Sequence, residues 1–192
     1  NRARQIKLFF ILTGHEEKTD LSEFRDFTRR LKTIRQRTGQ GIRITFSMGR
    51  LVRMPRTPLQ YSALTLDPRA WSPILGPVKS ACETNGFDFR LATEWDEYCA
   101  SQVMALGGYW LFEPLEQLAR QGHWYDKRLT AGFWQELKQW IESHGYWNPT
   151  FLGEKTTDYP FALDFVQSNV TSSFLYRQYQ DATRYVDNGY CL

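Results

Sequence analysis

Side chains that could do chemistry follow the apolar segment that ends at Gly14. His15 comes directly after this glycine, and Glu16, Glu17 and Asp20 follow in the segment HEEKTD. If the apolar segment is a parallel strand, these residues lie at its carboxyl end, where α/β proteins bind ligands. A carboxylate here could hold a ribose hydroxyl or an amine, but acids also favour helix starts through the helix dipole. A turn histidine in water is the alternative interpretation of His15.

The sequence lacks the common motifs for metal, phosphate and nucleophile chemistry. It has no Walker loop, no G-x-S-x-G and no H-E-x-x-H, and its three histidines have no ligand spacing. The three cysteines, Cys82, Cys99 and Cys191, are far apart, which argues against a disulfide framework and for a reducing, cytoplasmic location. Cys99 is expected to be a small core residue rather than a reactive thiol.

The charge of the chain is modest overall but uneven. Lys and Arg number 24 against 21 Asp and Glu, a net charge of +3 that is too weak to argue for nucleic acid by itself. One third of the chain holds a set of basic residues that could face RNA or another anionic ligand, or form the solvated face of a helix: Arg25, Arg29, Arg30, Lys32, Arg35, Arg37, Arg43, Arg50, Arg53 and Arg56. No apolar run is long enough to span a membrane, and no secretory signal is recognised.

The first half of the chain has the pattern of a strand, a helix and a strand. Residues 6–14 are almost continuously apolar, which is typical of a strand covered on both faces. A helical apolar stripe follows in residues 20–38, with Asp20 as N-cap, and residues 41–49 alternate with a period of two. This βαβ unit predicts parallel strands with a right-handed crossover. Its open edges and the abrupt start predict further strands from an upstream segment.

The rest of the chain is predicted to be mainly helical. Pro73 and Pro77 predict that a helix starts near Ser72 and kinks early, and residues 87–92 could form a short strand. Four more helices are expected in residues 93–107, 113–122, 130–145 and 172–186. The expected fold is therefore α/β, with a parallel βαβ unit first and a mainly helical region after it.

The segment RLVRMPRTPLQY, residues 50–61, carries the most specific motif in the chain. Its stretch Pro55-Arg56-Thr57-Pro58-Leu59-Gln60 resembles the exit from the sixth barrel strand of radical S-adenosylmethionine (SAM) enzymes of the cobalamin-binding-domain type. The segment FALDFVQSNVTSSFLYRQYQDAT also resembles the C-terminal extension of an uncharacterised branch of that group. Leu175 and Ala182 match its pattern, Gln178 replaces an acid, and Cys191 would be the first of its terminal cysteines.

The resemblance implies a fold: the end of a partial parallel (β/α) barrel in residues 1–65, followed by a helical C-terminal region in residues 66–192. It also implies a set of cofactor contacts and a partner. The fifth-strand motif of the family falls on Phe10, Leu12, Gly14 and Glu17, with Phe10 in place of a glycine, and the sixth strand ends near Leu51. The implied SAM contacts are Leu12, Gly14, Glu17, Leu51, Val52 and Arg53. The C-x-x-x-C-x-x-C motif that binds the [4Fe-4S] cluster is absent, so the resemblance implies that an upstream part of the same enzyme holds the cluster.

Three functions are open at this level. The chain is expected to be the C-terminal fragment of a radical SAM enzyme, not catalytic alone, with a helical cover over the substrate and a cobalamin domain possible upstream. The alternatives are a basic RNA-binding module and a helical protein-interaction module. The substrate is not specified by any recognisable pattern.

Overall fold

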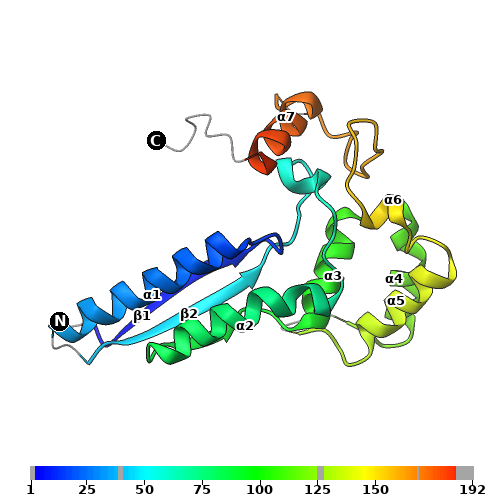
Figure 1. The fold of residues 1–192 in the computed structure, drawn as a ribbon. Coiled ribbons are helices and arrows are strands. Elements are labelled where there is room, and N and C mark those ends of the chain that lie inside the picture. Colours follow the sequence, from blue (N-terminus) through cyan, green and yellow to red (C-terminus); the bar gives the residue numbers. More distant parts are fainter. Residues whose placement is uncertain (1–2, 39–40, 125–127, 168, 185–192) are drawn as a thin grey trace. The chain divides into compact units, whose positions relative to one another are not determined.

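The computed structural model describes residues 3–38, 41–124, 128–167 and 169–184, and these form two compact units (Figure 1). The first unit comprises residues 1–51 and 65–95, and the second comprises residues 52–64 and 96–192. Each unit is thus built from two separate segments of chain. The predicted domain division after residue 65 stays a prediction. Within the described residues, no helix has the length and apolarity that a bilayer crossing requires.

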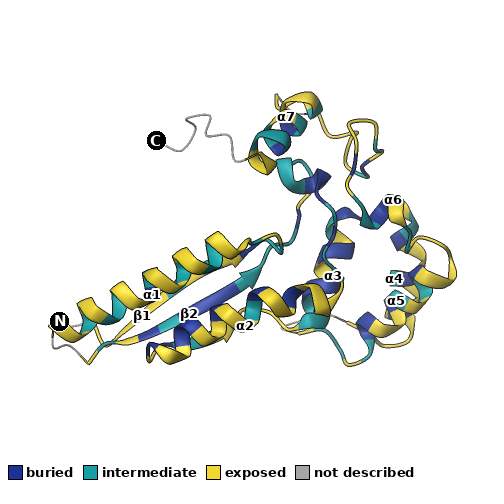
Figure 2. Cartoon of the chain, in the orientation of Figure 1, coloured by how far each residue is buried: buried dark blue, intermediate teal, exposed yellow. Residues whose placement is uncertain are grey.

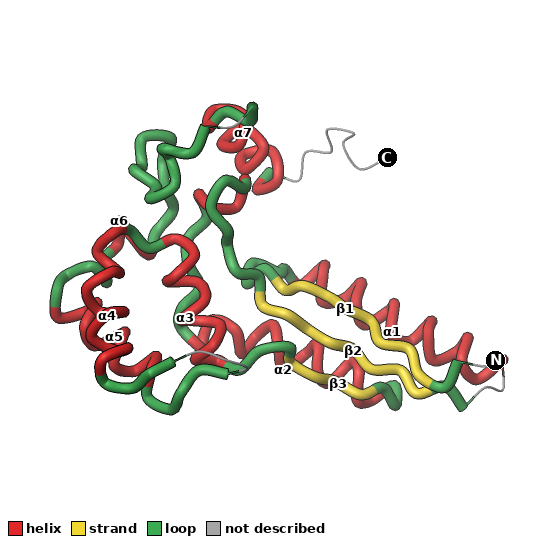
Figure 3. Tube along the Cα trace, turned by 180° about the vertical axis from the view of Figure 1, so that it is seen from behind, coloured by secondary structure: helices red, strands yellow, loops and turns green. Residues whose placement is uncertain are grey.

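The first unit is an α/β layer built on a three-stranded parallel sheet, and the predicted α/β class is confirmed. Its strands β1 (Gln5–Leu12), β2 (Arg43–Arg50) and β3 (Asp88–Leu91) lie in the order β1-β2-β3, side by side as Figure 3 shows. Helix α1 (Lys18–Thr38) connects β1 to β2, and α2 (Pro68–Thr84) precedes β3. The second neighbour of β2 is therefore β3, which comes from later in the chain. The sequence had predicted that further strands would come from an upstream segment. In the described part of the chain, nothing pairs with the outer edge of β1.

An aromatic cluster forms the core between the sheet and its helices. Phe46 of β2 is fully buried, and its ring lies 5.7 Å from Phe10 of β1, 5.7 Å from Phe24 of α1 and 5.5 Å from Phe87. Helices α1 and α2 also contact each other, so both cover the same face of the sheet. Figure 2 shows the resulting contrast between the buried β2 and the exposed outer side of α1.

The prediction that the first strand is covered on both faces is wrong. Phe9 and Ile11 of β1 are 72% and 66% exposed, because α1 and α2 cover only the opposite face. The apolar run that suggested two covered faces therefore includes residues that lie open on an edge strand. Such a surface is unusual for a strand unless another part of a protein covers it.

Two helix starts differ from the sequence expectation. In α1, the Glu17 carbonyl accepts the first helical hydrogen bond from Leu21, and the Asp20 carboxylate accepts from the Glu17 backbone N–H at 2.8 Å. Glu17 is thus the N-cap, and Asp20 lies inside the first turn. Helix α2 begins at Pro68 rather than near Ser72, because Asp67 caps it by accepting from Arg69. Proline is well tolerated at this first helical position.

The second unit is helical. Its helices are α3 (Trp95–Leu106), α4 (Phe112–Arg120), α5 (Phe133–Ser143), α6 (Pro149–Leu152) and α7 (Ser172–Thr183). The first residue of α3, Trp95, is assigned to the first unit. The second unit also contains two short 3-10 turns, η1 (Pro58–Tyr61) and η2 (Tyr109–Leu111). Cys99 on α3 is fully buried, as predicted. The predicted end of the last helix and Cys191 lie outside the described residues.

A second aromatic cluster packs α7 against η1. The Tyr61 ring lies 5.4 Å from Phe161, 5.0 Å from Tyr176 and 6.1 Å from Tyr179, and its hydroxyl donates to the Ser172 carbonyl at 3.2 Å. Tyr61 directly follows the Pro55–Gln60 motif. The two segments that carry the family resemblance therefore pack together within this unit.

Candidate functional site at the carboxyl edge of the sheet

The turn after β1 is held by Glu16. Its carboxylate accepts hydrogen bonds from the Thr13 backbone N–H, from the Thr13 hydroxyl at 2.9 Å and from the Gly14 N–H at 3.0 Å. Glu17, which the resemblance singled out, is exposed and caps α1 through its backbone. The carboxylate that is bonded within this turn is thus Glu16, and the SAM contact at Glu17 stays a prediction.

Gly14 allows this turn to pass close to the core. Its φ of +87° is in the region that favours glycine, and a Cβ here would lie 3.1 Å from Thr65 Oγ1 and 3.2 Å from the Trp71 ring. Trp71 is buried, and its indole N–H donates to the Thr65 carbonyl at 2.9 Å. Position 14 therefore requires glycine both for its backbone and for the space around it.

Arg50 ends β2 at the same edge. Its guanidinium lies 5.7 Å from the Trp71 ring and 5.3 Å from the Trp95 ring, and it donates to the Thr93 carbonyl at 3.2 Å. Two aromatic faces and a carbonyl hold this cation in place while it remains half-buried. A guanidinium fixed in this way can bind a carboxylate or phosphate group of a ligand.

The structure brings three of the predicted contacts together. The Leu51 N–H donates to the Leu12 carbonyl at 2.8 Å, which extends the pairing of β1 and β2 by one residue, and Gly14 follows two residues after Leu12. Leu12 is buried and Leu51 is half-buried. The carboxyl ends of β1 and β2 thus gather Leu12, Gly14, Leu51 and Arg50, in the place where α/β sheets bind ligands.

Val52 and Arg53 belong to the second unit instead. Arg53 is only 1% exposed, and Gln102 of α3 accepts from its backbone N–H at 2.8 Å and donates to its carbonyl at 3.1 Å. The expectation that Arg53 faces an anionic substrate or water does not fit this burial. Its backbone polar groups are already bonded within the chain.

A second buried cation lies near Arg53. Lys155 is 2% exposed, and its ammonium donates to the carbonyls of Phe151 at 2.7 Å and Gly153 at 2.8 Å. Burial lowers the pKa of Lys155 to about 8, and the charge of Arg53 adds to this effect. Burial and the neighbouring Glu154 raise the pKa of Tyr179 to about 12.

The Pro55–Gln60 motif is bonded within the second unit. Arg56 adopts a φ of 61°, its N–H donates to Gln60 Oε1 at 2.8 Å, and its guanidinium donates to the Val170 carbonyl at 2.9 Å. Thr57 donates to the Met54 carbonyl at 2.7 Å, and Pro58 starts η1. The motif thus forms a fixed turn that also contacts the segment before α7.

The described residues do not fit an iron-sulfur cluster. No three His, Cys, Asp or Glu side chains converge as metal ligands within them. Cys82 and Cys99 are both buried, and burial raises the pKa of the Cys82 thiol to about 12, which opposes the thiolate that a cluster needs.

The arginines of α1 do not form a uniform basic surface. Arg25, Arg29, Arg30 and Arg37 are exposed, as expected of a solvated helix face, but Asp26 lies among them and pairs with Arg29 at 3.1 Å. The RNA-binding alternative stays a prediction.

Sequence reasoning named Glu16 only as one of three nearby acids and missed its role in the turn; it also missed the aromatic contacts of Arg50 and the Gln102 bridge to Arg53. Glu16 could have been found from the Thr13-x-x-Glu16 spacing, which is typical of a reciprocal turn cap. The other two depend on residues far along the chain and leave no local pattern.

Comparison with known proteins finds no matching family model, no similar curated protein and no similar solved structure.

Proposed function

We propose that this chain is the C-terminal part of a radical SAM enzyme. Its sheet would supply the last strands of a partial (β/α) barrel and part of the SAM pocket, and the helical second unit would cover the substrate. The chain would not be catalytic alone, because its described residues hold no cluster site.

The winding of the sheet is the observation that carries this proposal. Strands β1, β2 and β3 follow in chain order, and both crossover helices cover the same face. (β/α) barrels keep this winding throughout, whereas a doubly wound sheet keeps it for one βαβαβ half and then places helices on the other face. The face opposite the helices has the exposed Phe9 and Ile11 on β1 and the polar Thr45 and Ser47 on β2, of which Ser47 is buried.

The carboxyl edge of the sheet supports a nucleoside-type cofactor. The half-buried Leu51 offers apolar surface beside the buried Leu12, and the glycine at position 14 lets the backbone turn where the strand ends. Arg50 adds a fixed positive charge beside them. The proposed contacts at Glu17, Val52 and Arg53 rest on the family resemblance alone.

The outer edge of β1 indicates where the missing parts would join. Within the described ranges this edge has no paired strand, and Phe9 and Ile11 next to it are exposed. An upstream strand of the same enzyme would pair here, and the segment that carries it would hold the [4Fe-4S] cluster. A cobalamin domain further upstream is part of the same proposal.

Anaerobic reconstitution of the full-length protein that contains this chain tests the proposal. We expect iron and sulfide in cluster amounts, and cleavage of SAM to 5'-deoxyadenosine. Gly14→Val should lower SAM affinity while leaving the iron content unchanged, because a side chain at position 14 collides with Thr65 and Trp71.

Gly76→Val is the matched control, since a Cβ at Gly76 meets nothing within 4 Å. A reconstituted protein without a cluster and without SAM cleavage would refute the assignment. Equal SAM affinity in the Gly14 and Gly76 variants would refute the placement of the pocket.

A further inference from the structure

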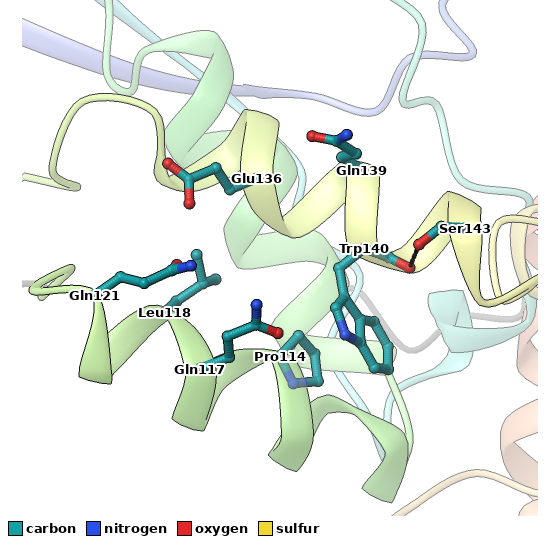
Figure 4. Close-up of a pocket in the computed structure, with 8 residues that line it drawn as sticks. All are labelled: Pro114, Gln117, Leu118, Gln121, Glu136, Gln139, Trp140 and Ser143. Carbon is teal, nitrogen blue, oxygen red and sulfur yellow. Dashed lines mark hydrogen bonds between the residues drawn. The ribbon is translucent and has the colours of Figure 1, made fainter.

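A polar pocket lies between α4 and α5 in the second unit. It has a volume of about 280 Å³, at the small end of the range for ligand sites. Figure 4 shows the eight side chains that line it. Four come from α4 and its C-cap, at positions 114, 117, 118 and 121, and four from α5, at positions 136, 139, 140 and 143. In each set the spacing is three, one and three residues, which places the four on one face of a helix.

Three glutamines supply most of the polar lining. Gln117, Gln121 and Gln139 are exposed, and their side-chain amides make no hydrogen bond to any other described residue. Each amide offers two donor hydrogens and an acceptor oxygen. The pocket therefore presents a dense set of neutral donors and acceptors that are available to a ligand.

One carboxylate is fixed at the same site. The Oε1 atom of Glu136 lies 3.1 Å from His123 Nε2, and His123 Nδ1 lies 2.7 Å from the Thr130 hydroxyl. A neutral His123 ring fits both bonds if Nε2 donates to Glu136 and Nδ1 accepts from Thr130. The second oxygen of Glu136 then remains for a ligand.

Apolar surface completes the lining. Leu118 and Pro114 are buried, and Trp140 is half-buried, with its ring stacked on His144 at 3.9 Å. In Figure 4, Trp140 and Pro114 lie beside each other at one end of the pocket, and Glu136 and Gln121 lie toward the other. The site thus combines a flat apolar end with a polar end.

We propose that this pocket binds a neutral, hydroxyl-rich ring of about one monosaccharide. Hydroxyl groups both donate and accept, as the three amides do, and the C–H surface of a sugar ring suits the indole and proline surface. The lining holds no lysine or arginine, and Glu136 repels anions, so phosphate and nucleotide ligands are disfavoured. This inference is independent of the radical SAM proposal.

Saturation-transfer NMR on the full chain tests the inference. The probes are glucose, galactose, mannose and N-acetylglucosamine at millimolar concentration, with methyl phosphate and choline as an anion and a cation that carry observable C–H protons. We expect transfer to at least one of the sugars and none to methyl phosphate or choline. Gln117→Ala and Gln121→Ala should each weaken sugar binding by up to about tenfold, through the loss of a hydrogen bond.

Gln36→Ala is the matched control, because Gln36 is an exposed glutamine on α1 and does not line the pocket. Circular dichroism should show that all three variants keep their helix content, since the replaced side chains are exposed. No transfer to any of these sugars, or transfer that the pocket variants leave unchanged, would refute the proposal. Transfer to methyl phosphate or choline in place of the sugars would refute the ligand class.

Discussion

Lys155 is the buried cation whose titration should be measurable in the stability of the protein. Its ammonium is almost inaccessible and donates to two carbonyls at the end of α6. Burial, assisted by the charge of Arg53, lowers its pKa from 10.5 to about 8. In the unfolded chain, the same amine keeps its ordinary pKa and binds a proton over a wider range of pH.

The sign of the pH dependence follows from proton binding. Between the folded pKa of about 8 and the unfolded value of 10.5, the unfolded chain binds more protons at this site than the folded chain does. The free energy of unfolding must therefore rise with pH across that window, by at most about 1.4 kcal/mol per pH unit. Residual solvent access reduces the total gain to about 2 to 3 kcal/mol.

Urea unfolding of the wild-type chain and Lys155→Met, from about pH 7 to about pH 10, measures this effect. The quantity to follow is the wild-type free energy of unfolding minus that of the variant, which should rise by about 2 to 3 kcal/mol. Methionine leaves the Phe151 and Gly153 carbonyls without their donor, but this loss does not depend on pH. Cys82 and Tyr179, whose pKa values are raised to about 12, titrate in both proteins and cancel in the difference.

Lys79→Met is the matched control. Lys79 is exposed on α2, where it pairs with Glu83 at 3.8 Å, so the corresponding difference should stay nearly constant up to about pH 9. A Lys155 difference that is equally flat, or that falls as pH rises, would refute the argument that burial controls this amine.

Three further substitutions test the fold. Gln102→Leu should lower the free energy of unfolding by about 2 to 3 kcal/mol, because it leaves the buried backbone groups of Arg53 without partners; thermal unfolding should show this, and a neutral effect would contradict the bridge. Phe46→Ala should cost about 3 to 5 kcal/mol in urea unfolding, since its ring is at the centre of the sheet core; less than about 1 kcal/mol would mean that the core is loosely packed. Phe9→Lys should leave the unfolding midpoint nearly unchanged and reduce self-association in light scattering, because Phe9 is exposed on an edge strand; marked destabilisation would show that this face is covered.

The sequence predicted the first three elements well because their signals are local. A short apolar run, a stripe at helical spacing and an alternating segment are enough to place β1, α1 and β2 within a few residues. The same run could not show that Phe9 and Ile11 are exposed, since its composition does not report how many faces the chain's own helices cover. The start of α2 was missed although Asp67-Pro68 is a typical cap and first helical residue.

The candidate site was only partly predictable for a related reason. Leu12, Gly14 and Leu51 lie at strand ends, and parallel strands bring their ends to a common edge. The guanidinium of Arg50 is held by the rings of Trp71 and Trp95, which come from later parts of the chain. No sequence pattern links these tryptophans to Arg50. Long-range pairs of this kind become visible only once the fold is known.

Each unit consists of two segments that are separated in the sequence, and this limits the order in which the units can fold during synthesis. The sheet remains incomplete until β3 at Asp88–Leu91 has left the ribosome, although β1 and β2 are made much earlier. The packing of residues 52–64 is delayed further, because the aromatic partners of Tyr61 lie in α7, which is synthesised late. A nascent chain stopped at about residue 95 would thus expose the turn η1 without its cover. Truncation from the C-terminus should consequently disturb the segment around Tyr61 before it disturbs the sheet.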